Sequence, residues 1–411
     1  MFFKKIVSLI VISSFFLTGC VANTAQKNTT KVGPRDSSSF FETEVIVPVL
    51  AKPKLDVIIP AFNPNLPDDP KDYEDEGIWP ELRRAEALRF AYKLKEALDK
   101  TEAFGAVRVT PDQTATGDLY ILGTIEESNG AEVEIDVKVL DISGDVWFDK
   151  SFDHEIHSTF HEDYRNKGKD SYDPLFEEAS IRIVKELKSH SDEDLASLQY
   201  LTDLRFGASF SEGAFSEHME QKGNKLRLVS KPSDDDPMLH RVKALRIRDQ
   251  MFVDGFQRNY STFTANMNDS YLMWQEQSLI EIEAEREATQ EAVMKGVGGV
   301  LLIGLSVLSG VMGATSDDPG VKSSAQSGAV LGGMAGVALL KDSFKVSEEA
   351  EVHRDTLNEL GESVDADLAP QVVEVEENTV KLTGDAQEQF MQWRTFLKKI
   401  YEQEATPDKQ L

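Results

Sequence analysis

Of the residues in this sequence, three closely spaced histidines come nearest to the pattern of a metal-binding or catalytic site. His154, His157 and His161 would share one face of a helix, and imidazoles on one face can bind zinc. The pattern instead places His154 at the end of a strand, and the sequence contains no HExxH spacing. The alternative is a solvated loop whose histidines are close by chance, and the sequence favours this loop over a metal site.

Other catalytic constellations have less support. The sequence contains no GxSxG for a serine nucleophile, and the glycine run after Lys295 lacks the GxxxxGK[ST] spacing of a phosphate loop. Cys20 is the only cysteine, so the chain can form neither an internal disulfide nor a thiolate metal cluster. We therefore predict a protein that is not an enzyme and needs no cofactor. A periplasmic enzyme that uses the three histidines remains an alternative.

The charge of the chain restricts its partners. Its 411 residues are enough for two or three domains, and 72 acidic against 44 basic residues give a formal net charge of −28. An acidic surface repels phosphate backbones, and the sequence has no basic, aromatic-containing patch to offset it. We predict no nucleic-acid partner.

The N-terminus has the organisation of a bacterial export signal. Phe2–Lys5 is positively charged, Ile6–Phe16 is apolar, and the tetrad LTGC ends at Cys20. This tetrad resembles the lipobox of bacterial lipoproteins, which implies that residues 1–19 are removed and that Cys20 carries a covalent lipid. Val21 in place of aspartate implies, by the sorting rule of such lipoproteins, the outer membrane. The alternative is an ordinary signal peptide with a chance cysteine.

The next two segments are expected to be a tether and a folded domain. Residues 20–44 are rich in Ser, Thr, Asn and Lys, which is typical of a flexible tether. Residues 45–190 alternate strand and helix patterns and predict a small α+β sandwich. The expected strands are Leu55–Pro60, Asp118–Ile125, Ala131–Leu140 and Val146–Phe152, and the expected helices are Glu81–Lys100 and Pro174–Lys188.

This segment also resembles a known domain. The strand that leads into Pro60-Ala61-Phe62-Asn63, the run DLYILGTI and the strand end DISGDVWFDKSF are similar to a periplasmic lipoprotein domain. It occurs in curli-secretion-channel lipoproteins, in penicillin-binding-protein activator lipoproteins and at the N-terminus of the Tol translocation protein. The resemblance implies a docking or assembly domain without a catalytic constellation. It does not imply a channel, because we find no amphipathic pore-forming hairpins in this segment.

Residues 191–295 predict a helical region. Aromatic and methionine side chains recur from Phe252 to Trp274 in steps of four and three, an eleven-residue repeat typical of one nearly straight helix. A helix from Pro237 to Lys295 would need a partner helix, either residues 191–220 folded back or a second copy of the chain. Four charged residues beside the stripe are expected to form a solvated, mutually paired flank: Arg246, Arg248, Asp249 and Asp254.

Residues 296–340 consist of two uncharged, glycine-rich arms joined by a short polar loop. Six glycines are spaced so that helices could approach closely: Gly299, Gly310, Gly313, Gly328, Gly332 and Gly336. The arms resemble the glycine-zipper hairpins of small outer-membrane lipoproteins. However, the second arm has 14 residues and would fall short of a bilayer core of about 30 Å. Membrane association, oligomer formation and packing within one chain all remain open.

The last segment, 341–411, predicts a helix, a β-hairpin at Gln371–Leu382 and a final helix at Ala386–Gln403. The expected fold is α+β: a small sandwich domain, a long helical body with a glycine-rich hairpin, and a C-terminal β-hairpin plus helix. We expect a non-enzymatic structural or docking lipoprotein of the outer membrane, with its body facing the periplasm. Its expected partners are membrane lipid and other envelope proteins or copies of itself. The alternative is an oligomeric channel or secretion-accessory lipoprotein.

Overall fold

The computed structural model describes residues 52–75, 78–294, 348–364, 371–375 and 378–404. The chain divides into two units, residues 1–36 and residues 37–411, and the described residues all belong to the second unit. Cys20 and the six glycines of the two arms lie outside the described residues.

A five-stranded mixed sheet forms the centre of the fold. Its strands are β1 (Val57–Pro60), β2 (Val107–Thr110), β3 (Leu119–Ser128), β4 (Glu132–Asp141) and β5 (Val146–Glu155). Their order in the sheet is β2-β1-β3-β4-β5. Strand β1 is parallel to both of its neighbours, and β3, β4 and β5 follow one another as antiparallel strands. The continuous apolar run of β1 fits this central position, because all four of its residues are buried.

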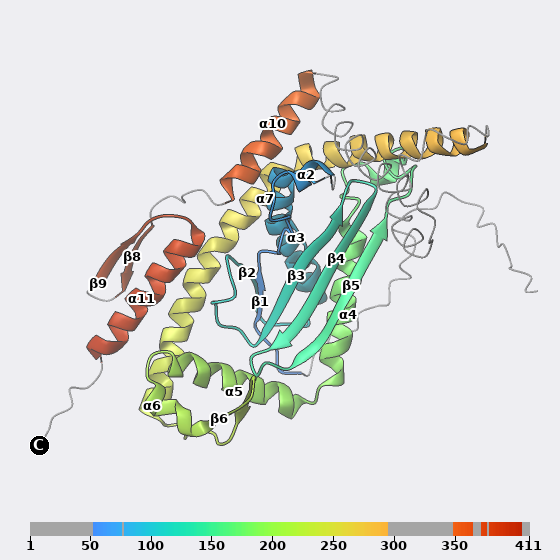
Figure 1. Ribbon diagram of the computed structural model, residues 1–411. Coiled ribbons are helices and arrows are strands. Elements are labelled where there is room, and N and C mark those ends of the chain that lie inside the picture. Colours follow the sequence, from blue (N-terminus) through green and yellow to red (C-terminus); the bar gives the residue numbers. More distant parts are fainter. Residues whose placement is uncertain (1–51, 76–77, 295–347, 365–370, 376–377, 405–411) are drawn as a thin grey trace, which may run out of the picture. The chain divides into compact units, whose positions relative to one another are not determined.

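Two helices cover the same face of the sheet, α3 (Pro80–Thr101) and α4 (Asp173–Ser189) (Figure 1). Proline stands at the start of each helix, where its missing N–H leaves no hydrogen bond unmade. In β4 the buried residues alternate with half-buried ones, so Val133, Ile135 and Val137 point towards these helices. The short helix α2 (Asp72–Asp75) and a 3₁₀ turn, η2 (Tyr164–Asn166), lie in the connections.

After the sheet the chain becomes mainly helical. Helix α5 (Asp192–Ala208) begins at the predicted cap, where the Asp194 backbone N–H donates to Ser191 Oγ at 3.1 Å. Short elements follow, namely α6 (Glu212–Phe215), η3 (Ser216–His218) and a hairpin of β6 (Met219–Lys222) and β7 (Lys225–Leu228). The sequence patterns predicted neither this hairpin nor strand β2, since each of these strands has only four residues, too few for an alternation of apolar and polar residues to stand out.

The predicted long helix is present as α7 (Pro237–Met294), a single element of 58 residues. Its aromatic stripe from Phe252 to Trp274 is buried except for the half-buried Phe263, and Met267 and Tyr271 are fully inaccessible. Helix α7 packs against α5, which lies in the segment 191–220 that was one of its two predicted partners. It also packs against α3, β2, α10 and α11. The stripe is therefore covered by several elements, and part of it lies directly on the sheet domain.

The C-terminal elements pack back on the earlier ones. Helix α10 (Glu348–Ser363) packs on α3 and α7, and a side chain at Gly361 would collide with the Glu81 carbonyl oxygen. The predicted hairpin and final helix are confirmed as β8 (Gln371–Val375), β9 (Asn378–Leu382) and α11 (Ala386–Glu404). The Trp393 ring of α11 stacks on Phe252 of α7 at a centroid distance of 4.8 Å.

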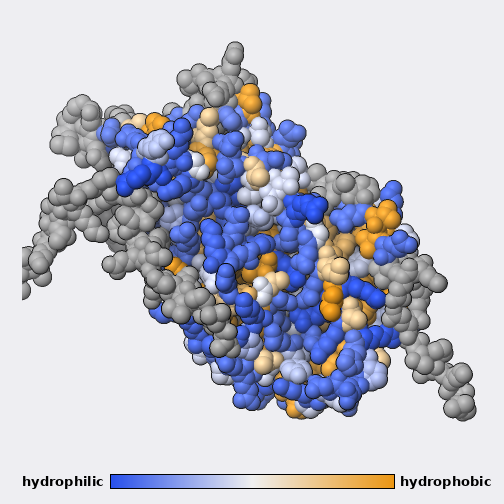
Figure 2. Space-filling view, turned by 180° about the vertical axis from the view of Figure 1, so that it is seen from behind, coloured by the Kyte–Doolittle hydropathy of each residue, from blue (hydrophilic) through white to orange (hydrophobic). Residues whose placement is uncertain are grey.

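The α+β fold class predicted from the sequence is thus confirmed. Among the described helices, none combines the length and apolar character that crossing a bilayer requires. The surface seen in Figure 2 is mainly hydrophilic, with apolar side chains in small separate patches, as the acidic composition leads one to expect.

Candidate functional site

Polar side chains of the long helix bind the open edge of the sheet. The Val109 backbone N–H donates to Gln257 Oε1 at 2.9 Å, and Gln257 Nε2 donates to the Val109 carbonyl at 2.8 Å. One turn earlier on α7, Asp254 accepts from Arg108 Nε at 2.6 Å and from Arg108 Nη2 at 3.2 Å. Gln257 therefore replaces a neighbouring strand for this part of β2, and the edge is no longer available for pairing there.

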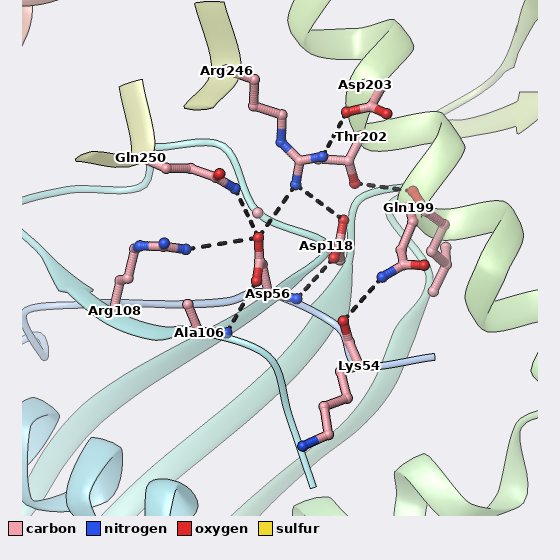
Figure 3. Close-up of polar contacts among 12 residues, drawn as sticks. Lys54, Asp56, Ala106, Arg108, Asp118, Gln199, Thr202, Asp203, Arg246 and Gln250 are labelled. Carbon is pink, nitrogen blue, oxygen red and sulfur yellow. Dashed lines mark hydrogen bonds and ion pairs between the residues drawn. The ribbon is translucent and has the colours of Figure 1, made fainter. Parts of the chain in front are cut away.

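A cluster of carboxylates lies where the parallel strands β1 and β3 begin (Figure 3). Asp56 precedes β1 and Asp118 precedes β3, so the pairing of these two strands brings the two acids together. Asp118 Oδ2 accepts from the Asp56 backbone N–H at 2.8 Å, and Asp56 Oδ1 accepts from the Ala106 N–H at 3.0 Å. Asp56 Oδ2 accepts from Gln250 Nε2 of α7 at 2.7 Å.

Arg246 of α7 joins this cluster to helix α5 (Figure 3). Its Nη1 donates to Asp203 Oδ1 at 2.6 Å, while its Nη2 lies 3.5 Å from Asp118 Oδ1 and 3.6 Å from Asp56 Oδ2. Burial raises the pKa of the Asp118 carboxyl, although the Arg246 charge acts against this shift. Asp118 is only 1% exposed, so removal of Arg246 would leave a buried carboxylate without its counter-charge.

A second polar cluster joins α3, β3 and the second half of α7. Glu86 is 1% exposed, and its Oε1 accepts from Ser128 Oγ at 2.6 Å and from Tyr271 Oη at 2.8 Å. Its Oε2 lies 3.6 Å from Arg83 Nε. Burial raises the pKa of Glu86 from 4.5 to about 7, against the opposing effects of Arg83 and the two hydroxyl donors. This side chain therefore changes charge close to neutral pH.

A buried ion pair continues the second cluster towards α4. Arg89 Nη2 donates to Asp170 Oδ2 at 2.6 Å, and Gln275 Nε2 of α7 donates to Asp170 Oδ1 at 2.8 Å. Lys93 Nζ lies 3.4 Å from the same carboxylate and donates to Asp173 at 2.8 Å. Burial alone would raise the pKa of Asp170, but the charges of Arg89 and Lys93 hold it at about 2. The Asp170 carboxylate is thus ionised at every physiological pH.

Together these contacts form two polar clamps between α7 and the sheet domain. The first clamp consists of Asp56, Asp118, Arg246 and Asp203, with Gln250, Gln257 and the Arg108–Asp254 pair beside it. The second clamp consists of Glu86, Arg89, Asp170, Ser128, Tyr271 and Gln275. Their hydrogen bonds join residues more than 40 positions apart, so the clamps fix how the elements pack and orient α7.

The predicted charged flank beside the stripe is wrong in most of its members. Asp249 is 2% exposed, and its Oδ1 accepts from Trp393 Nε1 at 3.2 Å. Arg246 pairs with Asp203 of α5, and Asp254 pairs with Arg108 of β2. These three residues do not pair with one another, because α5, α11 and β2 pack on α7 and supply their partners, although Asp254 itself stays exposed.

The structure does not bring the three histidines together as ligands of one metal ion. His154 ends β5 as predicted, while His157 and His161 lie in the following loop, where the Thr159 N–H donates to His157 Nδ1 at 3.3 Å. Burial lowers the pKa of both His154 and His161. Among the residues that the structure describes, no three His, Cys, Asp or Glu side chains are placed to hold a metal ion. Cys20 and the arm glycines cannot be placed, because they lie outside the described residues.

Of the charged residues in and beside the clamps, sequence reasoning singled out only Arg246 and Asp254, and it assigned both to a solvated flank instead of to contacts with the sheet domain. One signal was present: an aspartate stands immediately before or at the start of two apolar strand runs, Asp56 in LDVIIP and Asp118 in DLYILG. Two such acids at the same end of neighbouring parallel strands must lie close together. Their partners on α7 could not be identified in the same way, because charged residues are frequent along that helix.

Comparisons with protein-family models, with curated proteins and with solved structures gave no significant match to this chain.

Proposed function

We propose that the protein is a non-enzymatic, lipid-anchored component of a bacterial outer membrane that works as a docking or assembly unit. The LTGC tetrad that ends at Cys20, with the charged and apolar segments before it, supports the anchor and the location. In this proposal the body of the protein faces the periplasm, and its partners are other envelope proteins or further copies of the chain.

The observation that carries the docking role is that the buried and half-buried carboxylates serve to hold elements of the fold together. Asp56, Asp118, Glu86 and Asp170 are the kind of groups that catalysis employs, yet each of them accepts hydrogen bonds that join separate elements. Such contacts hold α7 on the sheet domain and fix the surface that, in this proposal, a partner contacts. They favour a scaffold over an enzyme, because a catalytic carboxylate must be free to contact its substrate.

In-cell photo-cross-linking tests the docking role. A photoreactive residue is placed, one position at a time, at Lys150 on β5 and at Val352 on α10, both of which are exposed. We expect a discrete adduct with an envelope protein or with a second copy at one of the two positions. The matched control carries the same reactive residue together with Cys20→Ser, and it should lose the adduct because the chain is no longer held at the membrane.

The outcomes of this experiment distinguish the docking role from the alternative of an oligomeric channel. Adducts with several copies of the chain would favour the alternative of an oligomeric channel or secretion accessory, for which the glycine arms at 296–340 are the motivating feature. The absence of any adduct at both positions, in cells that make the folded protein, would contradict the docking role.

A further inference from the structure

A cavity of about 340 Å³ lies on the face of the sheet opposite to α3 and α4. Its floor consists of Tyr120, Leu122 and Leu140, whose side chains alternate along β3 and β4 with the buried core residues. The volume is at the lower end of the range of about 300–1,000 Å³ that is usual for small-molecule sites. An apolar floor of this kind gives a small ligand a surface on which to bury its body.

The wall of the cavity is the hairpin β6–β7, and it is held firmly in place. The Leu226 N–H donates to the Ser143 carbonyl at 2.8 Å, which joins the hairpin to the turn between β4 and β5. Gly144 in this turn has a φ of +88°, and a Cβ there would lie only 2.7 Å from the Asn224 carbonyl oxygen. The turn and the hairpin therefore touch through their backbones, and the wall does not depend on flexible side chains.

The acidic groups at the cavity already have partners within the protein. Asp141 Oδ1 accepts from the Ser143 N–H at 2.9 Å and from Ser143 Oγ at 2.6 Å, and Asp141 Oδ2 accepts from Trp147 Nε1 at 3.0 Å. Lys225 forms an ion pair with Asp145. Lys225 and Asp145 offset each other's charge, and both oxygens of Asp141 already accept from neutral donors within the protein.

Arg205 of α5 differs from these groups. It lines the cavity, and its Nη1 donates to the Ile142 carbonyl at 3.0 Å. Arg205 is exposed, and among the residues that the structure describes no carboxylate lies within ion-pair distance of its guanidinium. An arginine offers five N–H donors in a planar fork that matches a carboxylate, and the bond to Ile142 uses only one of its nitrogens. The hydrogen bond to the backbone orients the guanidinium and leaves most of its donors available.

We propose that this cavity binds a small organic acid. The carboxylate of the ligand pairs with the Arg205 guanidinium, and a compact apolar body lies on Tyr120, Leu122 and Leu140. The Tyr120 ring is fixed for this contact, since its hydroxyl accepts from the Gly117 N–H at 3.2 Å and donates to the Ala115 carbonyl at 3.1 Å. This site is separate from the two clamps and from the docking role proposed above.

Phenylacetate is a suitable probe, because it joins a carboxylate to a compact ring, and phenylacetamide is its uncharged counterpart. Titrations of the full chain, followed by saturation-transfer NMR, should show phenylacetate binding that is about tenfold or more tighter than phenylacetamide binding. Arg205→Gln should remove this preference. The matched control is Arg227→Gln on β7, an exposed arginine that does not line the cavity, and it should bind phenylacetate as the unaltered protein does.

A second variant tests the cavity independently of the arginine. Leu122→Trp should fill the space above the sheet and abolish phenylacetate binding while Arg205 is retained, with an unchanged circular dichroism spectrum as the check on folding. The proposal is overturned if phenylacetate does not bind, if phenylacetamide binds equally well, or if either folded variant, Arg205→Gln or Leu122→Trp, binds phenylacetate as the unaltered protein does.

Discussion

Replacement of Glu86 by glutamine should remove a loss of stability that the unaltered protein shows as the pH rises. The unfolded chain releases the Glu86 proton near 4.5, while burial raises the pKa in the folded protein to about 7. Between these values the folded state holds a proton that the unfolded state has lost, so the free energy of unfolding falls as the pH rises. The stabilisation from this group is fully present below pH 4.5 and is lost above pH 7.

The size of the effect follows from the difference between the two pKa values. Each pKa unit corresponds to about 1.4 kcal/mol, which gives a loss of about 2.5 kcal/mol between pH 5 and pH 8. Tyr172, Tyr271 and Asp170 face the same cluster and do not titrate in this window, since burial raises the pKa of both tyrosines well above 10.0 and Asp170 is held at about 2. Glu86 is thus the group in this clamp that titrates between pH 5 and pH 8.

Glutamine retains the oxygen that accepts from Ser128 and Tyr271 but cannot ionise. Urea unfolding of the unaltered protein and of Glu86→Gln at pH 5, 6, 7 and 8 measures the difference in stability at each pH. We expect the variant to gain about 2 to 3 kcal/mol relative to the unaltered protein on going from pH 5 to pH 8. A pH-independent difference, or a change of opposite sign, would refute the assignment of this proton to Glu86.

The other predictions concern the remaining contacts of α7. Gln257→Ala should lower stability by about 1 to 2 kcal/mol and speed hydrogen exchange at the Val109 amide, and protection unchanged at that amide would count against the edge contact. Arg246→Gln should cost about 3 to 5 kcal/mol, and adding Asp118→Asn should restore part of the loss; equal losses in the single and double variants would contradict the ion pair. Trp393→Ala should cost about 3 to 5 kcal/mol in urea unfolding, and a loss below 1 kcal/mol would exclude the packing of α11 on α7.

Elements with a strong repeating pattern could be predicted from the sequence. The stripe from Phe252 to Trp274 indicated one long helix, and the buried positions Phe390, Trp393 and Leu397 of α11 follow the predicted spacing. A repeat of this kind reports burial directly, because each element must place its apolar residues on one face. The fold class followed from the order of these patterns.

Short elements and buried charges could not be predicted in this way. Strand β2 has four residues, and Val107 and Val109 alone do not distinguish a strand from a loop. The charged side chains of α7 were expected to be exposed to solvent. A charged residue can be predicted to be buried only when the residue that pairs with it is known. The partner of Arg246 lies 43 positions away in the sequence, and that of Asp254 lies 146 positions away, so only the folded chain identifies them.

The proposed lipidation of Cys20 offers the most direct test of the proposed function. Cells that produce the full chain are labelled with an alkyne analogue of palmitate, and their membranes are then separated and analysed beside those of a Cys20→Ser variant. The account predicts that the unaltered chain is labelled and is found with the outer membrane, and that the variant is unlabelled and released from it. Equal labelling and equal membrane association of the two proteins would contradict the central claim.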